Sequence, residues 1–241
     1  MGGFGSGRGQ DGKDTTSDMR MLDVRRLQRD GLLTPGRAFG WQWTRHGEEV
    51  ASIQIRTEVD RVMLTYRTRH NVGYLVVEEL ASRLGASFAR HRRAHADTAE
   101  AHAFVGTPEH CRVVLLKSRT YMNESGGPVK AALDFTKATS LVVVHDEIDL
   151  PLGGLRVKFG GGDNGHNGLR SIRKSLGTGS FYRVRLGVGR PTGRQDPADY
   201  VLSDFRAAER TEVDLMVGEA ADATEYLMRH GLDATQARFN R

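Results

Sequence analysis

The chain has 241 residues, of which 27% are charged and 38% hydrophobic, a balance that is typical of globular proteins and excludes a wholly disordered chain. Its formal net charge of +5 is compatible with a polyanionic partner but does not establish one. The single cysteine, Cys111, excludes an internal disulfide. The sequence contains neither a signal peptide nor an apolar run of about 20 residues, so we expect a cytoplasmic protein without a membrane span.

The first 67 residues differ in composition from the rest of the chain. Residues 1–17 are mostly glycine, serine, aspartate and lysine, and we expect them to be disordered because they cannot bury enough apolar surface to offset the entropy of ordering. A short helix is predicted at 18–29, and strands are predicted at 38–44, 51–56 and 62–66, with a hairpin turn at His46 and Gly47. Residues 1–67 are therefore predicted to form a small β-rich appendage.

From Thr68 onward, helical and strand patterns alternate along the chain. Helices are predicted at residues 71–85, 125–137, 166–176 and 207–229, the last of them closed by Gly231. Apolar strands are predicted at residues 112–117, 141–145, 154–159 and 182–188. This alternation predicts an α/β domain over residues 68–241, with a mixed, largely parallel central sheet flanked by helices.

Four polar segments lie at the ends of these predicted elements. They are residues 69–73 (Arg-His-Asn-Val-Gly), 121–127 (Tyr-Met-Asn-Glu-Ser-Gly-Gly), 145–149 (His-Asp-Glu-Ile-Asp) and 160–168 (Gly-Gly-Gly-Asp-Asn-Gly-His-Asn-Gly). Loops at strand ends are where open α/β folds place their functional sites. Each segment has an ordinary alternative when taken alone, since His70 could cap a helix and Asp146 could end a turn. The joint occurrence of all four indicates a functional site.

In this order, the four segments resemble those of the bacterial peptidyl-tRNA hydrolases, and the resemblance extends from about Thr68 nearly to the C-terminus. It implies an enzyme that hydrolyses the ester bond between a peptide, or an N-blocked amino acid, and tRNA. Such an enzyme recycles tRNA from peptidyl-tRNA released by ribosomes. The resemblance also implies a cytoplasmic monomer that binds peptidyl-tRNA and uses neither a metal nor another cofactor.

The resemblance assigns roles to individual residues. His70 corresponds to the general base and Asp146 to the carboxylate that holds this histidine. The residues implied to bind peptide and tRNA are Tyr66, Tyr121, Asn123 and Asn167, and those implied to clamp the tRNA 5′-phosphate are Lys158 and Arg185. The chemistry supports these roles, because a histidine can activate water near neutral pH and a carboxylate on its other nitrogen fixes the tautomer. Taken singly, the asparagines could be turn residues, the tyrosines core residues, and the cations solvated charges.

The start of the chain departs from the pattern of this family. The family normally begins with a central apolar strand that ends in Gly-x-Gly-Asn-Pro-Gly and supplies an active-site asparagine. Here no asparagine precedes Asn71, and Tyr66 lies four residues before His70 where the family typically has five. Residues 62–66 have the apolar character to take the place of the lost strand. The departure predicts impaired activity and leaves open the alternative of a non-catalytic, RNA-binding relative of the hydrolases.

Overall fold

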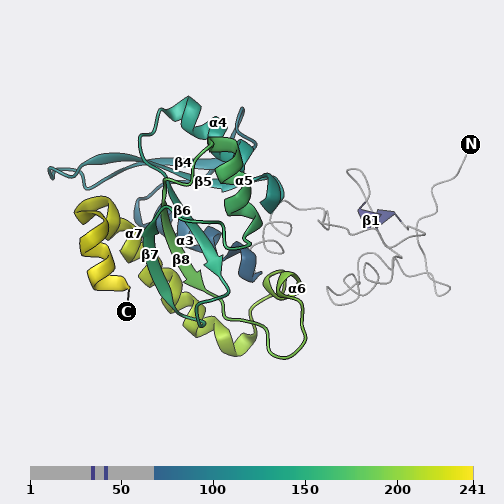
Figure 1. The fold of residues 1–241 in the computed structure, drawn as a ribbon. Coiled ribbons are helices and arrows are strands. Elements are labelled where there is room, and N and C mark those ends of the chain that lie inside the picture. The colour runs from purple at the N-terminus through teal and green to yellow at the C-terminus, as the bar shows by residue number, and fades with distance from the viewer. Residues whose placement is uncertain (1–33, 36–40, 43–67, 241) are drawn as a thin grey trace, which may run out of the picture. The chain divides into compact units, whose positions relative to one another are not determined.

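The structure, a computed structural model, describes residues 34–35, 41–42 and 68–240 (Figure 1). The chain divides into two compact units, residues 1–65 and 66–241. In the first unit, β1 (Thr34–Pro35) pairs antiparallel with β2 (Trp41–Gln42), which falls inside the strand predicted at 38–44. The other predicted features of this region lie outside the described residues, namely the disordered leader, the helix, the hairpin turn, the strands at 51–56 and 62–66, and Tyr66.

In the second unit, the strands of the described residues form two three-stranded sheets. The first sheet is antiparallel, in the order β3 (Ala89–His91), β4 (Ala96–Ala103), β5 (Cys111–Ser118). The second has the order β6 (Val142–Glu147), β8 (Tyr182–Gly187), β7 (Leu155–Phe159), in which β6 is parallel to β8 and β7 is antiparallel to it. The predicted α/β class is confirmed, and the parallel pairing in this part of the chain is that of β6 with β8.

Helices cover both faces of the strands. They are α3 (Val72–Arg83), α4 (Gly126–Thr136), α5 (Asn167–Leu176), the short α6 (Pro197–Val201) and α7 (Arg210–Phe239). Three 3₁₀ turns accompany them, η1 (Arg69–Asn71), η2 (Met122–Glu124) and η3 (Ala207–Glu209). Helix α3 packs against α7 on one side of the strands, and α4 packs against α5 on the other (Figure 1). Gly231 lies where the last helix was predicted to end, and its non-helical backbone (φ 77°, ψ −178°) interrupts α7 before the helix resumes.

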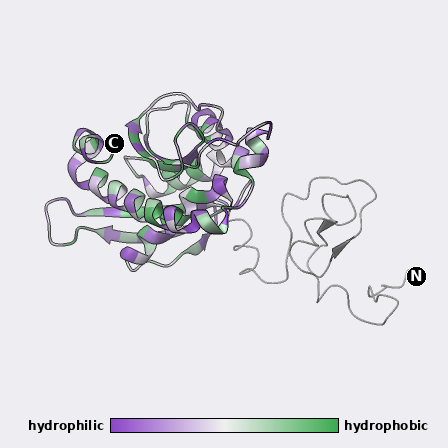
Figure 2. Cartoon of the chain, turned by 90° about the horizontal axis from the view of Figure 1, so that it is seen from below, coloured by the Kyte–Doolittle hydropathy of each residue, from purple (hydrophilic) through white to green (hydrophobic). Residues whose placement is uncertain are grey.

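Hydrophobic cores lie on both faces of the second sheet. Val142 and Val144 pack into the core beneath α3 and α7, whereas Val143 packs with Leu169 and Ile172 of α5. This alternation follows from the strand period of two, which sends successive side chains to opposite faces. The helices carry hydrophobic residues on the side turned to the strands and hydrophilic residues on the other (Figure 2).

Helix α3 lies directly on β6 at Gly73. A Cβ atom at this position would collide with the backbone carbonyl oxygen of Val144, so glycine is required for the close approach. The approach brings the start of α3, with His70 in η1, to the carboxyl end of β6, where Asp146 is the penultimate residue.

Candidate active site

The structure brings two of the predicted residues, His70 and Asp146, into contact. Nδ1 of His70 lies 2.8 Å from Oδ1 of Asp146, although the two residues are 76 positions apart. Their side chains are 12% and 3% exposed, so the contact is largely shielded from water. A carboxylate accepts hydrogen bonds, so His70 donates through Nδ1 and its Nε2 carries the free lone pair. A histidine in this state can remove a proton from water.

A second histidine, His166, contacts the same carboxylate oxygen; it lies in the predicted segment 160–168, but the sequence assigned it no role. Its Nδ1 accepts a hydrogen bond from the backbone N–H of Leu169 and thereby caps α5. The other nitrogen must then carry the hydrogen, and it donates to Oδ1 of Asp146 over 3.0 Å. The rings of His70 and His166 lie 4.7 Å apart. Two imidazoles of defined tautomer therefore hold one carboxylate.

Asp146 is ionised despite its burial. Burial opposes the charge, but hydrogen bonds from His166 and His70 outweigh that effect and hold the pKa of Asp146 below its usual range. The residue is consequently a fixed negative charge at neutral pH. It can stabilise the positive charge that His70 acquires when it takes a proton.

A third histidine, His145, packs behind the pair and is neutral. Its Nδ1 donates to the backbone oxygen of Asp146 over 2.7 Å, and its ring meets that of His166 edge-on at 5.0 Å. Burial, with a further contribution from His166, lowers the pKa of His145 to about 3. Its Nε2 is buried and has no hydrogen-bond partner among the described residues. His145 thus supports the position of His166 without adding charge.

Arg69 fixes the position of η1 through contacts with the segment that precedes α7. The guanidinium is 2% exposed and binds both carboxylate oxygens of Glu209, at 2.9 and 2.7 Å. It also donates to Oγ of Ser203 over 3.1 Å and lies 4.5 Å above the ring of Tyr200. Both hydrogen bonds to Glu209 come from Nη2, and such charge-assisted bonds are stronger than neutral ones. The residue next to His70 is therefore anchored to the segment that leads into α7.

The predicted substrate-binding residues Tyr121, Asn123 and Asn167 are exposed on two neighbouring elements. Tyr121 and Asn123 belong to the segment around η2, and Asn167 is the first residue of α5. The two elements touch, because a Cβ at Gly168 would lie 2.7 Å from the sulfur of Met122. Segments more than 40 residues apart in the chain are thus brought together beside His166.

The predicted phosphate-binding residues Lys158 and Arg185 lie on β7 and β8. Burial lowers the pKa of Lys158, and the nearby charges of Arg185 and Arg183 lower it further. Arg183 is buried and donates to the backbone oxygens of Gly161 and Gly162 in the glycine-rich loop. These cations make one face of the β7–β8 pair positive, and an anion bound there would be favoured.

Glu147, which the sequence did not predict as a partner, already pairs with Arg185. Its Oε2 accepts from Nη2 and Nε of Arg185 at 2.7 and 3.1 Å. Because Glu147 directly follows Asp146 on β6, it links the cationic face to the histidine cluster. Glu147 therefore already occupies Nε and Nη2 of Arg185.

The histidine cluster could also be considered as a metal site. His70, Asp146 and His166 each offer one ligand atom, and these atoms lie within 4.8 Å of one another. Both histidines already donate to the same carboxylate oxygen, so hydrogen bonding accounts for the arrangement without an ion.

Within residues 68–240, no helix is long and apolar enough to cross a membrane.

The fold and this site define an α/β protein with a shielded histidine–aspartate pair. Such a pair can act as the general base and its carboxylate partner in a hydrolase that activates water. The sequence matches the family "Peptidyl-tRNA hydrolase" over residues 65–241. The peptidyl-tRNA hydrolase of Nocardia farcinica is 52% identical over 176 residues, covering 72% of this chain and 89% of that protein, and that of Streptomyces coelicolor is 51% identical over 174 residues, covering 71% and 86%. The crystal structure of peptidyl-tRNA hydrolase from Acinetobacter baumannii has a TM-score of 0.66 at 27% identity, covering 87% of this chain and 92% of that one. The chain belongs to the peptidyl-tRNA hydrolase family, as its resemblance predicted.

Proposed function

We propose that this protein hydrolyses the ester bond between a peptide and tRNA, with water as the nucleophile and His70 as the general base. The observation that carries the proposal is the hydrogen bond from Nδ1 of His70 to ionised Asp146. It leaves Nε2 of His70 as a base in a site that lies at the end of a strand, where α/β enzymes bind their substrates. Membership of the family supplies the substrate class.

The reaction can be written in terms of these residues. Nε2 of His70 takes a proton from water as the water oxygen attacks the ester carbonyl carbon, and negative charge develops on the carbonyl oxygen. The amides of Asn123 and Asn167, both exposed beside the cluster, are suited to donate to that oxygen or to the peptide backbone. The tetrahedral intermediate then expels the ribose oxygen of tRNA, which receives the proton from the His70 imidazolium. Asp146 stabilises this imidazolium throughout.

The remainder of the substrate is a polyanion, and the positive face around Lys158 and Arg185 supports its binding. Lys158 is partly buried, and the like charges of Arg185 and Arg183 lower its pKa, so a bound phosphate would offset the repulsion among these cations. Tyr121, with a relative exposure of 57%, offers a flat ring on which a base at the tRNA end could stack. These residues hold the tRNA while the ester lies at His70.

The test is the release of the acyl group from N-blocked aminoacyl-tRNA. The variant His70→Ala should reduce turnover by roughly 10²-fold or more, which is the usual scale for loss of a general base. The matched control is His110→Ala, since His110 is an exposed histidine of the β4–β5 loop outside the cluster. Turnover by His70→Ala near that of the unmodified protein would exclude the assignment.

The same preparation distinguishes the enzyme from a non-catalytic RNA-binding relative. That alternative follows from the absence of any asparagine before Asn71. The non-catalytic alternative requires tight binding of tRNA by the unmodified chain together with no release of the acyl group above the rate in buffer.

We further propose that the protein acts as a cytoplasmic monomer. Light scattering of the purified chain would measure its oligomeric state, and fractionation of cells would measure its location.

A further inference from the structure

Three arginines lie on and beside the turn that joins β3 to β4, outside the site described above. Arg90 belongs to β3, and Arg92 and Arg93 belong to the turn; all three residues are exposed. Within residues 68–240, none of the three takes part in an ion pair. The proposed reaction gives these cations no role.

Two carboxylates on the neighbouring elements are already paired with other cations. Asp97 lies opposite Arg90 in the pairing of β3 with β4, but it accepts from Arg119 over 3.1 Å. Asp134 of α4 pairs with Lys130 over 3.2 Å. The three arginines of the turn therefore keep an uncompensated positive charge, which favours an anionic ligand.

The turn is anchored, so its cations project from a fixed backbone. Nδ1 of His91 accepts hydrogen bonds from the backbone N–H groups of Arg93 and Ala94, at 3.2 and 3.0 Å. Ala94 is buried and packs with Ala132 of α4. The guanidinium of Arg93 lies 5.9 Å from the ring centre of Phe135. A ligand that binds an ordered turn has less ordering entropy to overcome.

The turn adjoins the segment of the predicted substrate-binding residues. The backbone N–H of Arg119 donates to the backbone oxygen of His95, at the end of the turn, over 3.0 Å. Tyr121 and Asn123 follow Arg119 in the same segment. Four residues of chain reach at most about 14 Å, so Arg119 and Asn123 lie within that distance of each other. An extended peptide of about four or five residues covers the same distance.

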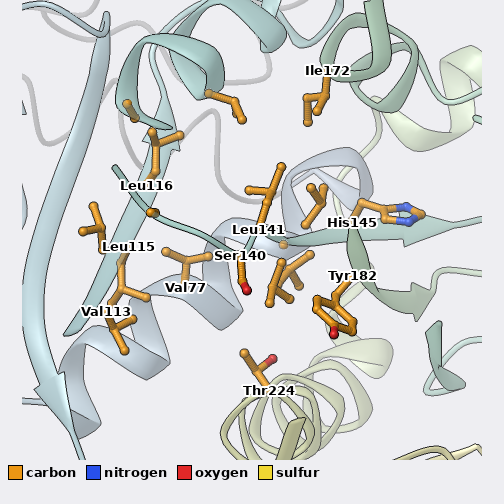
Figure 3. Close-up of a pocket in the computed structure, with 18 of the residues that line it drawn as sticks. Val77, Val113, Leu115, Leu116, Ser140, Leu141, His145, Ile172, Tyr182 and Thr224 are labelled. Atoms are coloured by element: carbon orange, nitrogen blue, oxygen red, sulfur yellow. The ribbon is translucent and has the colours of Figure 1, made fainter. Parts of the chain in front are cut away.

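The turn and the predicted phosphate-binding residues lie on opposite sides of Asp146. Lys158 and Arg185 belong to the second sheet, in which β6 is the strand farthest from β7. Figure 1 shows β6 between β5 and β8, and Leu115 of β5 and His145 of β6 line one pocket (Figure 3). A tRNA held on β7 and β8 would leave the side of β5 and the turn to the peptide.

We propose that Arg90, Arg92 and Arg93 bind acidic side chains of the peptide. The protein would then prefer peptidyl-tRNAs whose peptides carry Asp or Glu about four to eight residues from the ester. The proposal rests on the hydrolytic function proposed above. Guanidinium groups form charge-assisted hydrogen bonds with carboxylates, and exposed pairs of this kind are individually weak and screened by salt.

The test compares peptidyl-tRNAs that differ in the peptide alone. N-blocked peptides of about ten residues carry Glu, Gln or Lys at positions four to eight from the ester, and N-blocked aminoacyl-tRNA is too short to reach the turn. We expect kcat/KM to be roughly 3- to 10-fold higher for the Glu peptide than for the Lys peptide at low salt. This preference should disappear at about 1 M salt.

The double variant Arg90→Ala, Arg92→Ala should bring the ratio of the Glu to the Lys substrate close to one. Arg93 is left in place because of its contact with Phe135. The matched control is Arg194→Ala with Arg210→Ala, which removes two exposed charges elsewhere and should keep the ratio. A KM that rises equally for all four substrates, including N-blocked aminoacyl-tRNA, would indicate contact with the tRNA and would overturn the proposal.

Binding separates failure of this proposal from failure of the proposed function. The Kd of the His70→Ala variant for the Glu and Lys substrates is measured without turnover, and we expect the Glu substrate to bind more tightly by a similar factor. Equal Kd values for the two substrates would overturn the proposal even if both are hydrolysed. Absence of turnover with every substrate would contradict the hydrolytic function, and the preference would then be decided by the Kd values.

Discussion

His166 and His70 donate hydrogen bonds to the same oxygen of Asp146, at 3.0 and 2.8 Å. Only a few orientations of the Asp146 carboxylate place Oδ1 within reach of both histidines. The hydrogen bond from His166 therefore helps to hold the carboxylate in an orientation that also accepts from His70. His166 is therefore a positioning residue for the His70–Asp146 pair. Its side chain also caps α5, so the two roles must be separated in any test.

The variant His166→Asn keeps a capping side chain but is too short to reach Asp146. We expect turnover to fall roughly 10- to 100-fold, the scale seen when groups that orient a functional side chain are removed. The acidic limb of the pH–rate profile should move to higher pH, because Asp146 then keeps more negative charge beside His70. A merely structural role would lower the melting temperature and leave the profile in place.

Asp146→Asn should change the pH profile in the opposite sense. The asparagine keeps the size of the side chain but removes the charge that stabilises the His70 imidazolium. We expect turnover to fall by roughly 10²-fold or more and the acidic limb to move to lower pH. Rates measured from about pH 5 to pH 9 on N-blocked aminoacyl-tRNA would decide, since this range spans the titration of histidine. A profile unchanged in height and midpoint would contradict the pairing.

The regular elements after residue 68 could largely be predicted from periodicity, and the exceptions have physical causes. Strand β4 was not predicted, because its sequence, Ala-Asp-Thr-Ala-Glu-Ala-His-Ala, is poor in residues that favour strands. It forms because all eight of its residues pair with β5, from Ala96 opposite Ser118 to Ala103 opposite Cys111. Helix α6 was also missed, although Asp196 caps it and Pro197 begins it.

The site could be predicted in its residue types but not in its connections. The pairing of His70 with Asp146 depended on resemblance to a family, because residues 76 positions apart reveal no contact by spacing. The second role of His166 depends on which ring nitrogen caps α5, which a sequence does not specify. The pairing of Glu147 with Arg185 depends on the register of β6 against β8, and adjacent parallel strands leave that register open until they are packed.

The double variant Lys158→Ala, Arg185→Ala should weaken binding of full-length substrate and leave the chemical step intact. We expect KM for peptidyl-tRNA to rise and the slope of log affinity against log salt concentration to fall by about one unit for each phosphate that is no longer bound. A short acylated oligonucleotide without the 5′-phosphate should be nearly unaffected. Lys130→Ala with Arg210→Ala removes the same charge from exposed positions elsewhere and serves as the control. Equal losses on both substrates would indicate a structural role.

His145 makes the stability of the protein depend on pH in a defined range. The unfolded chain protonates this histidine below its ordinary pKa of 6.5, whereas the folded protein does so near 3. Between these values the unfolded state binds the extra proton, so the free energy of unfolding falls as the pH falls, by up to about 1.4 kcal/mol per pH unit. The stabilising contribution of neutral His145 is complete above pH 6.5.

The variant His145→Asn keeps a donor for the backbone oxygen of Asp146 but does not titrate. Urea unfolding at about pH 4.5, 5.5 and 7 should show that its free energy of unfolding decreases less steeply with acidification than that of the unmodified protein. The exposed His110→Asn should keep the full slope. Parallel curves for His145→Asn and the unmodified protein would show that His145 is not the responsible group.

The anchoring of Arg69 has a consequence for genetics. Arg69 directly precedes His70. It pairs with Glu209, 140 positions later, and forms hydrogen bonds with the backbone and the side chain of Ser203. A survey of random substitutions should therefore find a group of inactivating changes at positions 200–209, although none of the proposed site residues lies there. Such substitutions would lower activity as substitutions at the site itself do, and second-site suppressors of them would be found around position 69.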